Sequence, residues 1–237
     1  PHDPFEVTFP TADGVRLHAT WKPSPAGAAA PAVLLVHAFS RERRDLAELA
    51  DELLARGFPT LAVDLRGHGD SKKTKDGGTL DAKLLSAEQF RRMIRMDMEK
   101  FKAFLMEKHN AGELNIELLC VVGAEMGSIV ALEWAGVDWA WPVLATGKQG
   151  QDARALVLIS PEFSSKYLRL GPVLNFQPVM KNLSILILVG KGDSRASRDA
   201  QRLYNSFKKF HPDVPDEEKR DRQDLFFGRL DTSLQGA

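Results

Sequence analysis

The stretch Gly123-Ala124-Glu125-Met126-Gly127 follows directly on an apolar run at positions 118–122, Leu-Leu-Cys-Val-Val. This pattern predicts a buried strand that turns sharply into a helix, because the two glycines relieve crowding where the chain reverses. In a turn of this kind the central side chain stands exposed above the sheet. Here the central residue is Glu125, so a carboxylate decides which chemistry the turn supports.

Four more short apolar runs, rich in β-branched residues, accompany the one at 118–122. They span residues 32–36, 60–65, 155–159 and 185–189. None alternates polar with apolar residues, which is typical of strands covered on both faces. Helical patterns lie between them, including 45–56 and a longer stretch that begins at Ser86. Strands that alternate with helices predict a parallel sheet with helices on both faces.

The two ends of the chain extend this sheet. Two alternating segments, 5–10 and 16–21, flank Ala-Asp-Gly at 12–14 and predict an antiparallel hairpin. Near the other end we expect a helix at 195–210, a charged stretch at 211–222 and a strand at 225–230. We therefore predict one α/β domain over residues 1–237, with a doubly wound, mostly parallel sheet of about eight strands.

Composition narrows the range of partners. Lys plus Arg and Asp plus Glu number 32 each, so no net charge attracts nucleic acid or an anionic membrane. No apolar run approaches the roughly 18 residues of a membrane-spanning helix. No targeting segment follows Pro1, although one could have been removed before it. Cys120 is the only cysteine, which excludes an intrachain disulfide and predicts a buried, unreactive thiol. We expect a small-molecule or protein partner, no cofactor and no metal.

Four ordered motifs resemble those of the α/β-hydrolase family. Residues 122–127 resemble its nucleophile elbow, G-x-S-x-G after a strand, with glutamate in place of serine. Val-His-Ala-Phe at 36–39 resembles the His-Gly-x segment after the third strand, with Ala38 in place of glycine. Asp-Leu-Arg-Gly-His-Gly-Asp-Ser at 64–71 is close to the D-x-R-G-H-G-x-S turn, and Gly-Lys-Gly-Asp at 190–193 matches the G-x-x-D loop. The resemblance implies the α/β-hydrolase fold, and the short reach at 161–182 implies that no large cap is inserted.

The resemblance also assigns roles at the site. It places the two oxyanion-binding amides at Phe39 and Met126 and the catalytic acid at Asp193. For Asp193, an N-cap of the helix that begins near Arg195 is an equally good interpretation. Glu162, after the preceding strand, is a weaker candidate for the acid.

A catalytic histidine is missing from its expected place. The family places it after the final strand, and residues 231–237 contain none. We expect His211 to be a solvated residue at a helix end and His68 to shape the turn at 64–71. The remaining candidates, His2, His18 and His109, lie outside the matching motifs.

Three interpretations of Glu125 remain open. It could be an acidic nucleophile, as the elbow aspartate is in dehalogenases and epoxide hydrolases of this fold. It could instead fold back and fill the oxyanion site formed by the Phe39 and Met126 amides. It could also be a tolerated replacement in a former hydrolase.

The charges near Glu125 affect its pKa, whereas the missing serine and histidine determine the main expectation for function. The nearby cations are Arg41, Arg43, Lys191 and Arg195, and without one of them close a buried Glu125 should have a raised pKa. We predict an α/β-hydrolase-fold protein without serine-hydrolase activity that acts as a binding or scaffold module. The alternative is a hydrolase of small esters or related compounds that uses Glu125 as nucleophile or base together with Asp193.

Overall fold

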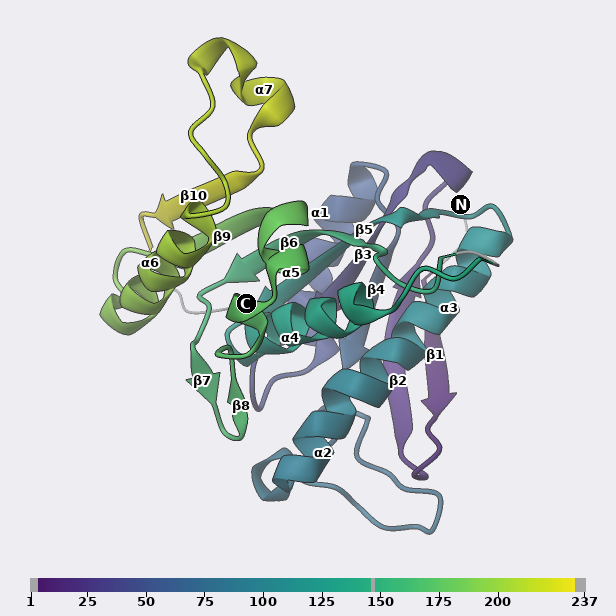
Figure 1. Cartoon of the computed structure of the whole chain (residues 1–237). Coiled ribbons are helices and arrows are strands. Elements are labelled where there is room, and N and C mark those ends of the chain that lie inside the picture. The colour runs from purple at the N-terminus through teal and green to yellow at the C-terminus, as the bar shows by residue number, and fades with distance from the viewer. Residues whose placement is uncertain (1–3, 146–147, 233–237) are drawn as a thin grey trace.

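One mostly parallel sheet runs through the molecule. The computed structural model describes residues 4–145 and 148–232, and its eight-stranded sheet has the order β1-β2-β4-β3-β5-β6-β9-β10 (Figure 1). The strands are β1 (Phe5–Pro10), β2 (Arg16–Lys22), β3 (Pro31–Val36), β4 (Thr60–Asp64), β5 (Asn115–Ala124), β6 (Ala153–Ile159), β9 (Ser184–Gly190) and β10 (Leu225–Leu230). Strand β2 is antiparallel to both neighbours, and all other pairs are parallel. The predicted hairpin, strands and fold class are confirmed.

Helices fill the connections between the strands. The α-helices are α1 (Ala47–Ala55), α2 (Ala87–Arg92), α3 (Met98–Asn110), α4 (Met126–Ala140), α5 (Gln177–Asn182), α6 (Ser194–Lys208) and α7 (Lys219–Arg222). Single turns are η1 (Gly27–Ala29), η2 (Arg43–Leu46), η3 (Ala82–Leu84), η5 (Val173–Asn175) and η6 (Asp216–Glu218). None of the helices in the described ranges is long and apolar enough to cross a membrane.

The helix that begins at Ser86 is interrupted, which the sequence did not predict. Its start is as expected, because Ser86 and Gln89 form a capping box. Seven residues after Ser86 the backbone widens into a π-helical turn, η4 (Met93–Asp97), before α3 continues. This turn carries the fully buried Asp97 toward the loop after β4. The irregular backbone thus accompanies a buried ion pair.

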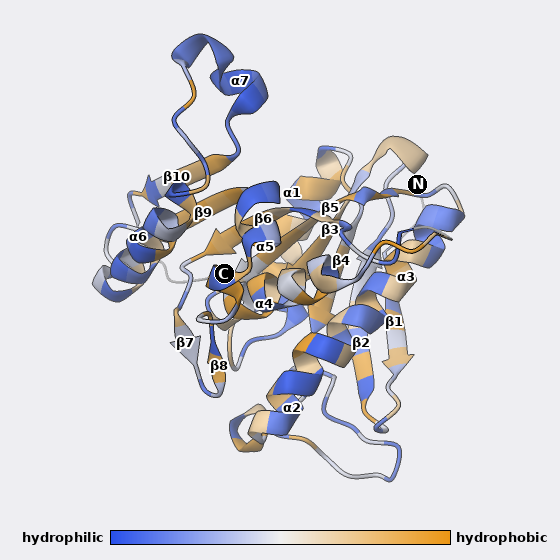
Figure 2. Cartoon of the chain, in the orientation of Figure 1, coloured by the Kyte–Doolittle hydropathy of each residue, from blue (hydrophilic) through white to orange (hydrophobic). Residues whose placement is uncertain are grey.

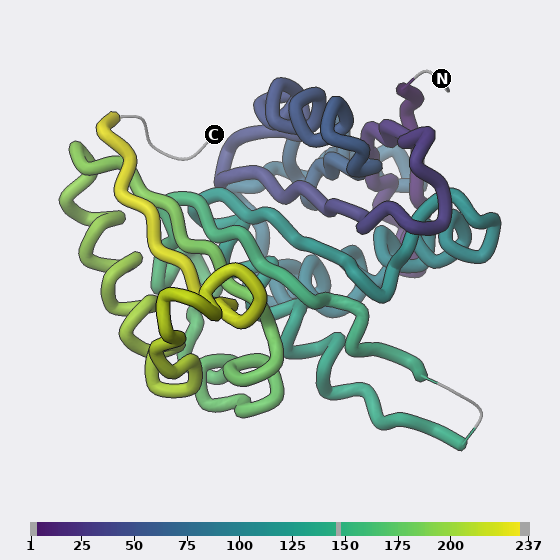
Figure 3. Tube along the Cα trace, turned by 90° about the horizontal axis from the view of Figure 1, so that it is seen from above, coloured from purple at the N-terminus to yellow at the C-terminus, as the bar shows by residue number. Residues whose placement is uncertain are grey.

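Both faces of the sheet are covered. On β3, Leu34 belongs to the core cluster that includes α3 and α4, whereas its neighbour Leu35 packs with Ala50 of α1. The view from above places α1 on one side of the sheet and α3 and α4 on the other (Figure 3). In Figure 2 the central strands are coloured mostly hydrophobic, whereas α2, α3 and α6 contain many hydrophilic residues. Cys120 lies half-buried on β5, where burial raises its pKa to about 12 and keeps the thiol protonated.

Two segments lie outside this layered arrangement. Between β6 and β9 the chain forms a short hairpin, β7 (Ser164–Ser165) and β8 (Leu168–Arg169), followed by η5 and α5. After α6, the charged segment that contains α7 projects away from the sheet before β10 begins (Figure 1). The carboxyl ends of β3, β4, β5, β6 and β9 meet at one edge, where parallel sheets form their ligand sites.

Candidate functional site

The turn at residues 123–127, called the Glu125 turn below, is closed by two glycines at which any side chain would collide with backbone atoms. A Cβ atom on Gly123 would lie 2.3 Å from the carbonyl oxygen of Gly127. A Cβ atom on Gly127 would lie 2.4 Å from the carbonyl oxygen of Val36. Helix α4 therefore begins in direct backbone contact with β3 and β5.

Glu125 itself is held in a strained conformation. Its φ of 49° and ψ of −113° lie in a region that non-glycine residues rarely adopt. The backbone is fixed on both sides: the Glu125 N–H donates to the Ile159 carbonyl at 2.9 Å, and the Glu125 carbonyl accepts from the Ser128 N–H at 3.0 Å. Strain of this kind persists only where the surrounding structure enforces it.

The Glu125 side chain lines an acidic cavity at the carboxyl ends of β5, β6 and β9. The cavity has a volume of about 220 Å³, and its wall is formed by Glu125, Ser160, Glu162, Asp193, Arg195, Ala196 and Asp199. We call it the acidic pocket. Burial and the charge of Glu162 raise the pKa of Glu125, with a smaller contribution from Asp193, while the charge of Arg41 opposes them. The sequence analysis expected a raised pKa if no cation lay close, and here the pKa is raised even though the charge of Arg41 acts on Glu125.

The carboxylate of Glu125 does not fill an oxyanion site. It makes no capping hydrogen bond to the start of α4, and the Glu125 side chain forms no hydrogen bond with any described residue. The hypothesis that Glu125 folds back onto the Phe39 and Met126 amides is therefore wrong. Phe39 is half-buried, with the Lys166 ammonium 4.6 Å from its ring centre.

Asp193 caps a helix, which is one of the two interpretations that the sequence left open. Its Oδ1 accepts hydrogen bonds from the N–H groups of Arg195 at 3.1 Å and Ala196 at 2.9 Å, so it caps α6. It also lines the acidic pocket with Glu125 and Glu162. The structure thus brings the three predicted carboxylates together.

His211 is buried, and the prediction of a solvated histidine is wrong. Only 2% of its surface is exposed, with Nε2 2.9 Å from the Met180 carbonyl and Nδ1 2.8 Å from the Asp224 carboxylate. Met180 belongs to α5, and Asp224 directly precedes β10. Both lie far from His211 along the chain, so a local sequence pattern could not predict these contacts. Helix α6, 15 residues or about 22 Å long, separates His211 from Asp193.

The other histidines also lie outside the acidic pocket, whose described lining contains none. His109 contacts the Leu114 carbonyl at 3.1 Å, and His18 lies on β2, paired with Thr8. His2 lies outside the described residues.

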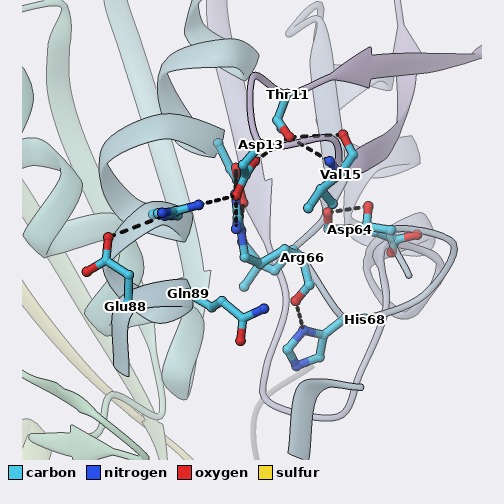
Figure 4. A network of polar contacts seen from close by, with 12 residues as sticks. Thr11, Asp13, Val15, Asp64, Arg66, His68, Glu88 and Gln89 are labelled. Carbon is cyan, nitrogen blue, oxygen red and sulfur yellow. Dashed lines mark hydrogen bonds and ion pairs between the residues drawn. The ribbon is translucent and has the colours of Figure 1, made fainter. Parts of the chain in front are cut away.

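The two histidines of the β3 and β4 loops hold those loops in place. The His37 Nε2 accepts from the Leu65 N–H at 3.1 Å, so its Nδ1–H donates to the Ala38 carbonyl at 2.7 Å. His68 Nδ1 lies 3.0 Å from the Arg66 carbonyl (Figure 4). Burial lowers the pKa of each histidine to about 4, so both are neutral at pH 7. The structural interpretation of His68 agrees with this geometry.

Charged groups brace the same loops. Asp64 accepts from the N–H of Arg43 at 2.7 Å and from the N–H of Asp70 at 2.8 Å, and it also pairs with the Arg43 guanidinium. The Arg43 guanidinium therefore forms its buried ion pair with Asp64 and not with Glu125. Lys191 lies 3.9 Å from Asp231. Of the four predicted cations, Arg195 lines the acidic pocket and Arg41 acts on Glu125 through its charge.

Two further polar residues of the acidic pocket were missed by the sequence analysis. Ser160 follows β6 directly and has a positive φ of 45°. Its position at the carboxyl end of a parallel strand was a signal that could have identified it. Asp199 lies on α6, and its carboxylate accepts a hydrogen bond from the Phe163 N–H at 3.3 Å. No pattern in the sequence indicates this contact. Within the described ranges, no cluster of three or more His, Cys, Asp or Glu side chains is arranged to hold a metal ion.

Comparison with known proteins identifies the family. The model of the serine aminopeptidase family S33 matches residues 27–208. The chain belongs to this family. No curated protein matches the sequence. The S33 match covers the strands from β3 to β9 and therefore the Glu125 turn.

Solved structures share the fold of this S33 member. An esterase from Pyrococcus furiosus is 19% identical, with 96% of this chain and 83% of the esterase covered and a TM-score of 0.65. A putative α/β hydrolase of unknown function from Agrobacterium tumefaciens is 17% identical, with coverages of 95% and 84% and a TM-score of 0.60. A dienelactone hydrolase from Anabaena variabilis is 16% identical, with coverages of 97% and 87% and a TM-score of 0.52. At these identities the comparison establishes the α/β-hydrolase fold alone.

Proposed function

We propose that this chain is an S33 family member without serine-hydrolase activity, in which the acidic pocket binds a ligand and does not cleave it. One observation carries the proposal: the described lining of that pocket holds four carboxylates, one guanidinium and no imidazole. Acyl transfer by the family's mechanism needs a serine nucleophile and a histidine base. In this proposal Glu125 occupies the nucleophile position, and the other charged groups of the pocket are three carboxylates and the Arg195 guanidinium.

The position of Asp193 supports the same conclusion. In a triad the acid orients the imidazole and stabilises the imidazolium that forms. Here the Asp193 carboxylate caps α6 through two backbone amides. In serine proteases that lack the nucleophile and the base, oxyanion donors and substrate binding alone still accelerate the reaction roughly 10³- to 10⁴-fold over water. Binding is thus the main capability that remains.

A second candidate function rests on the raised pKa of Glu125. The carboxyl groups of Glu125 and Asp193 line one pocket, and burial with the Glu162 charge raises the Glu125 pKa. A raised pKa moves a carboxylate toward the range in which it works as a general base. Under this proposal the chain hydrolyses small esters with Glu125 as nucleophile or base and Asp193 as its partner.

Ester turnover separates the two functions. We would measure p-nitrophenyl acetate and butyrate hydrolysis by the wild type, Glu125→Ala and Glu125→Ser. A matched control is Glu117→Ala, which removes an exposed carboxylate from the opposite end of β5. We expect all four proteins to react at the same background rate, with Glu125→Ser inactive because no imidazole serves it. Turnover that is lost in Glu125→Ala but kept in Glu117→Ala would establish the second function instead. Intact-mass spectra would then reveal whether an acyl or alkyl adduct forms.

A further inference from the structure

We propose that the loops after β3 and β4 form a second site, which binds a small anion that carries a phosphate group. A cavity of about 370 Å³ lies between these loops. Its wall is formed by Ser40, Arg41, Gly67, His68, Gly69, Lys72, Thr79, Leu80, Asp81, Ala82 and Lys83. We call it the basic pocket. It shares no lining residue with the acidic pocket, so the proposal holds whether or not Glu125 catalyses hydrolysis.

Three cations on this wall form no ion pair with the described residues, although the charge of Arg41 also acts on Glu125. Arg41, Lys72 and Lys83 are exposed, and their side chains form no ion pair or hydrogen bond within the part of the chain that the structure describes. A neighbouring guanidinium in the same loops is paired, since Arg44 lies 2.7 Å from the Asp70 carboxylate. The three unpaired cations border one concave surface, where like charges raise the local concentration of anions.

The net charge of the wall is positive. Asp81 contributes the only carboxylate of the lining, and its Oδ1 accepts from the Lys83 N–H at 2.9 Å. His68 adds no charge, because burial lowers its pKa to about 4. Three cations and one carboxylate leave two positive charges. The whole chain has 32 basic and 32 acidic residues, so this excess is local.

The donors on the wall suit phosphate oxygens. The planar guanidinium of Arg41 matches phosphate geometry, and the lysine ammonium groups bind phosphate as point charges. Ser40 and Thr79 add hydroxyl groups to the wall. The Thr79 Oγ1 accepts from the Lys73 ammonium at 3.2 Å, which leaves its proton free to be donated. A volume of about 370 Å³ is within the range of small-molecule pockets and larger than a bare ion needs.

Calorimetric titration with pyrophosphate at constant ionic strength tests this site. We expect the wild type to bind, and the variant Arg41→Gln/Lys72→Gln/Lys83→Gln to bind at least about tenfold more weakly, as the loss of one charge-assisted hydrogen bond would give. The matched control is Arg16→Gln/Lys100→Gln/Lys209→Gln, which removes the same charges at exposed positions outside the basic pocket. This control should bind pyrophosphate as the wild type does.

Each other outcome counts against the proposal. Absence of binding to the wild type, or equal weakening by the control, would overturn it. Citrate that binds as tightly as pyrophosphate would overturn the preference for phosphate. If the triple variant does not fold, Lys72→Gln and Lys83→Gln are tested singly. Each removes an exposed cation and should weaken binding severalfold, and wild-type affinity in both would also contradict the proposal.

Discussion

The Arg66 guanidinium and the Asp97 carboxylate face each other as two parallel forks. Arg66 Nε and Nη2 each lie 2.6 Å from one Asp97 oxygen, and both side chains are fully buried. Arg66 Nη1 also donates to Asp13 at 2.9 Å (Figure 4). The pair therefore joins the loop after β4 to the π-helical turn, and Asp13 adds the β1–β2 hairpin. Arg66, which belongs to the motif at 64–71, therefore connects three elements next to Gly67 of the basic pocket: the loop after β4, the π-helical turn and the hairpin.

Replacing Asp97 should be costly. Asp97→Asn leaves the buried Arg66 charge without its main partner, and loss of one member of a buried pair lowers the free energy of unfolding by about 3–5 kcal/mol. Urea denaturation followed by circular dichroism measures the change. The control is Asp76→Asn, an exposed aspartate outside every ion pair of the described residues, which should change stability by less than about 0.5 kcal/mol. A loss below about 1 kcal/mol in Asp97→Asn would contradict the structural role.

The regular parts of the fold could be predicted because their signals are local. Uniform apolar runs marked the strands, and Ser86 with Gln89 marked a helix start that the structure contains. The π-helical turn could not be predicted in this way. It accompanies the pairing of Asp97 with Arg66, 31 positions away, and no local periodicity encodes such a partner.

The close approach at Gly127 provides a second prediction. In Gly127→Ala the new Cβ would lie 2.4 Å from the Val36 carbonyl oxygen and 2.6 Å from that of His37, both backbone atoms. Because backbone cannot move aside cheaply, we expect a loss of about 3 kcal/mol in the free energy of unfolding. Gly171→Ala is the control, since its Cβ would meet no atom within 4 Å. Thermal unfolding that is equal for the two variants would show that α4 can shift away from β3.

The candidate site was partly predictable for a topological reason. Glu125 and Asp193 follow parallel strands of the same sheet, so their meeting at one edge follows from the fold. The acidic character of the pocket was not predictable, since Asp199 reaches it from within α6. The burial of His211 depends on Met180 and Asp224, and only the folded chain brings these two together.

Two substitutions should move the pKa of Glu125 in opposite directions. The charge of Arg41 stabilises the Glu125 carboxylate, so Arg41→Gln should raise the pKa further. The charge of Glu162 destabilises it, so Glu162→Gln should lower the pKa toward its ordinary value. Carbon-13 NMR titration of the glutamate carboxyl groups measures both shifts, with the Glu125 signal assigned by its absence in Glu125→Gln. Shifts in the same direction would mean that the two variants act by changing the burial of Glu125.

Glu133 should make stability depend on pH. Burial raises the pKa of its carboxyl group to about 7, although the Val173 N–H and the charge of Arg95 oppose this, and its Oε1 has no hydrogen-bond partner in the described structure. Because the folded-state pKa lies above the unfolded value, the stabilising contribution of Glu133 is complete below about pH 4.5. It is lost as the pH rises through 7. Glu133→Gln keeps the shape of the side chain and removes its charge.

We therefore expect Glu133→Gln to match the wild type at pH 4.5 and to be more stable by about 1 kcal/mol at pH 8, a value reduced for partial solvent screening. Urea denaturation at the two pH values measures the difference. The control is Glu107→Gln on the exposed side of α3, which should give equal changes at both. A Glu133→Gln variant that gains no stability between pH 4.5 and 8 would mean that the wild-type carboxyl group is already ionised at the lower pH in the folded protein.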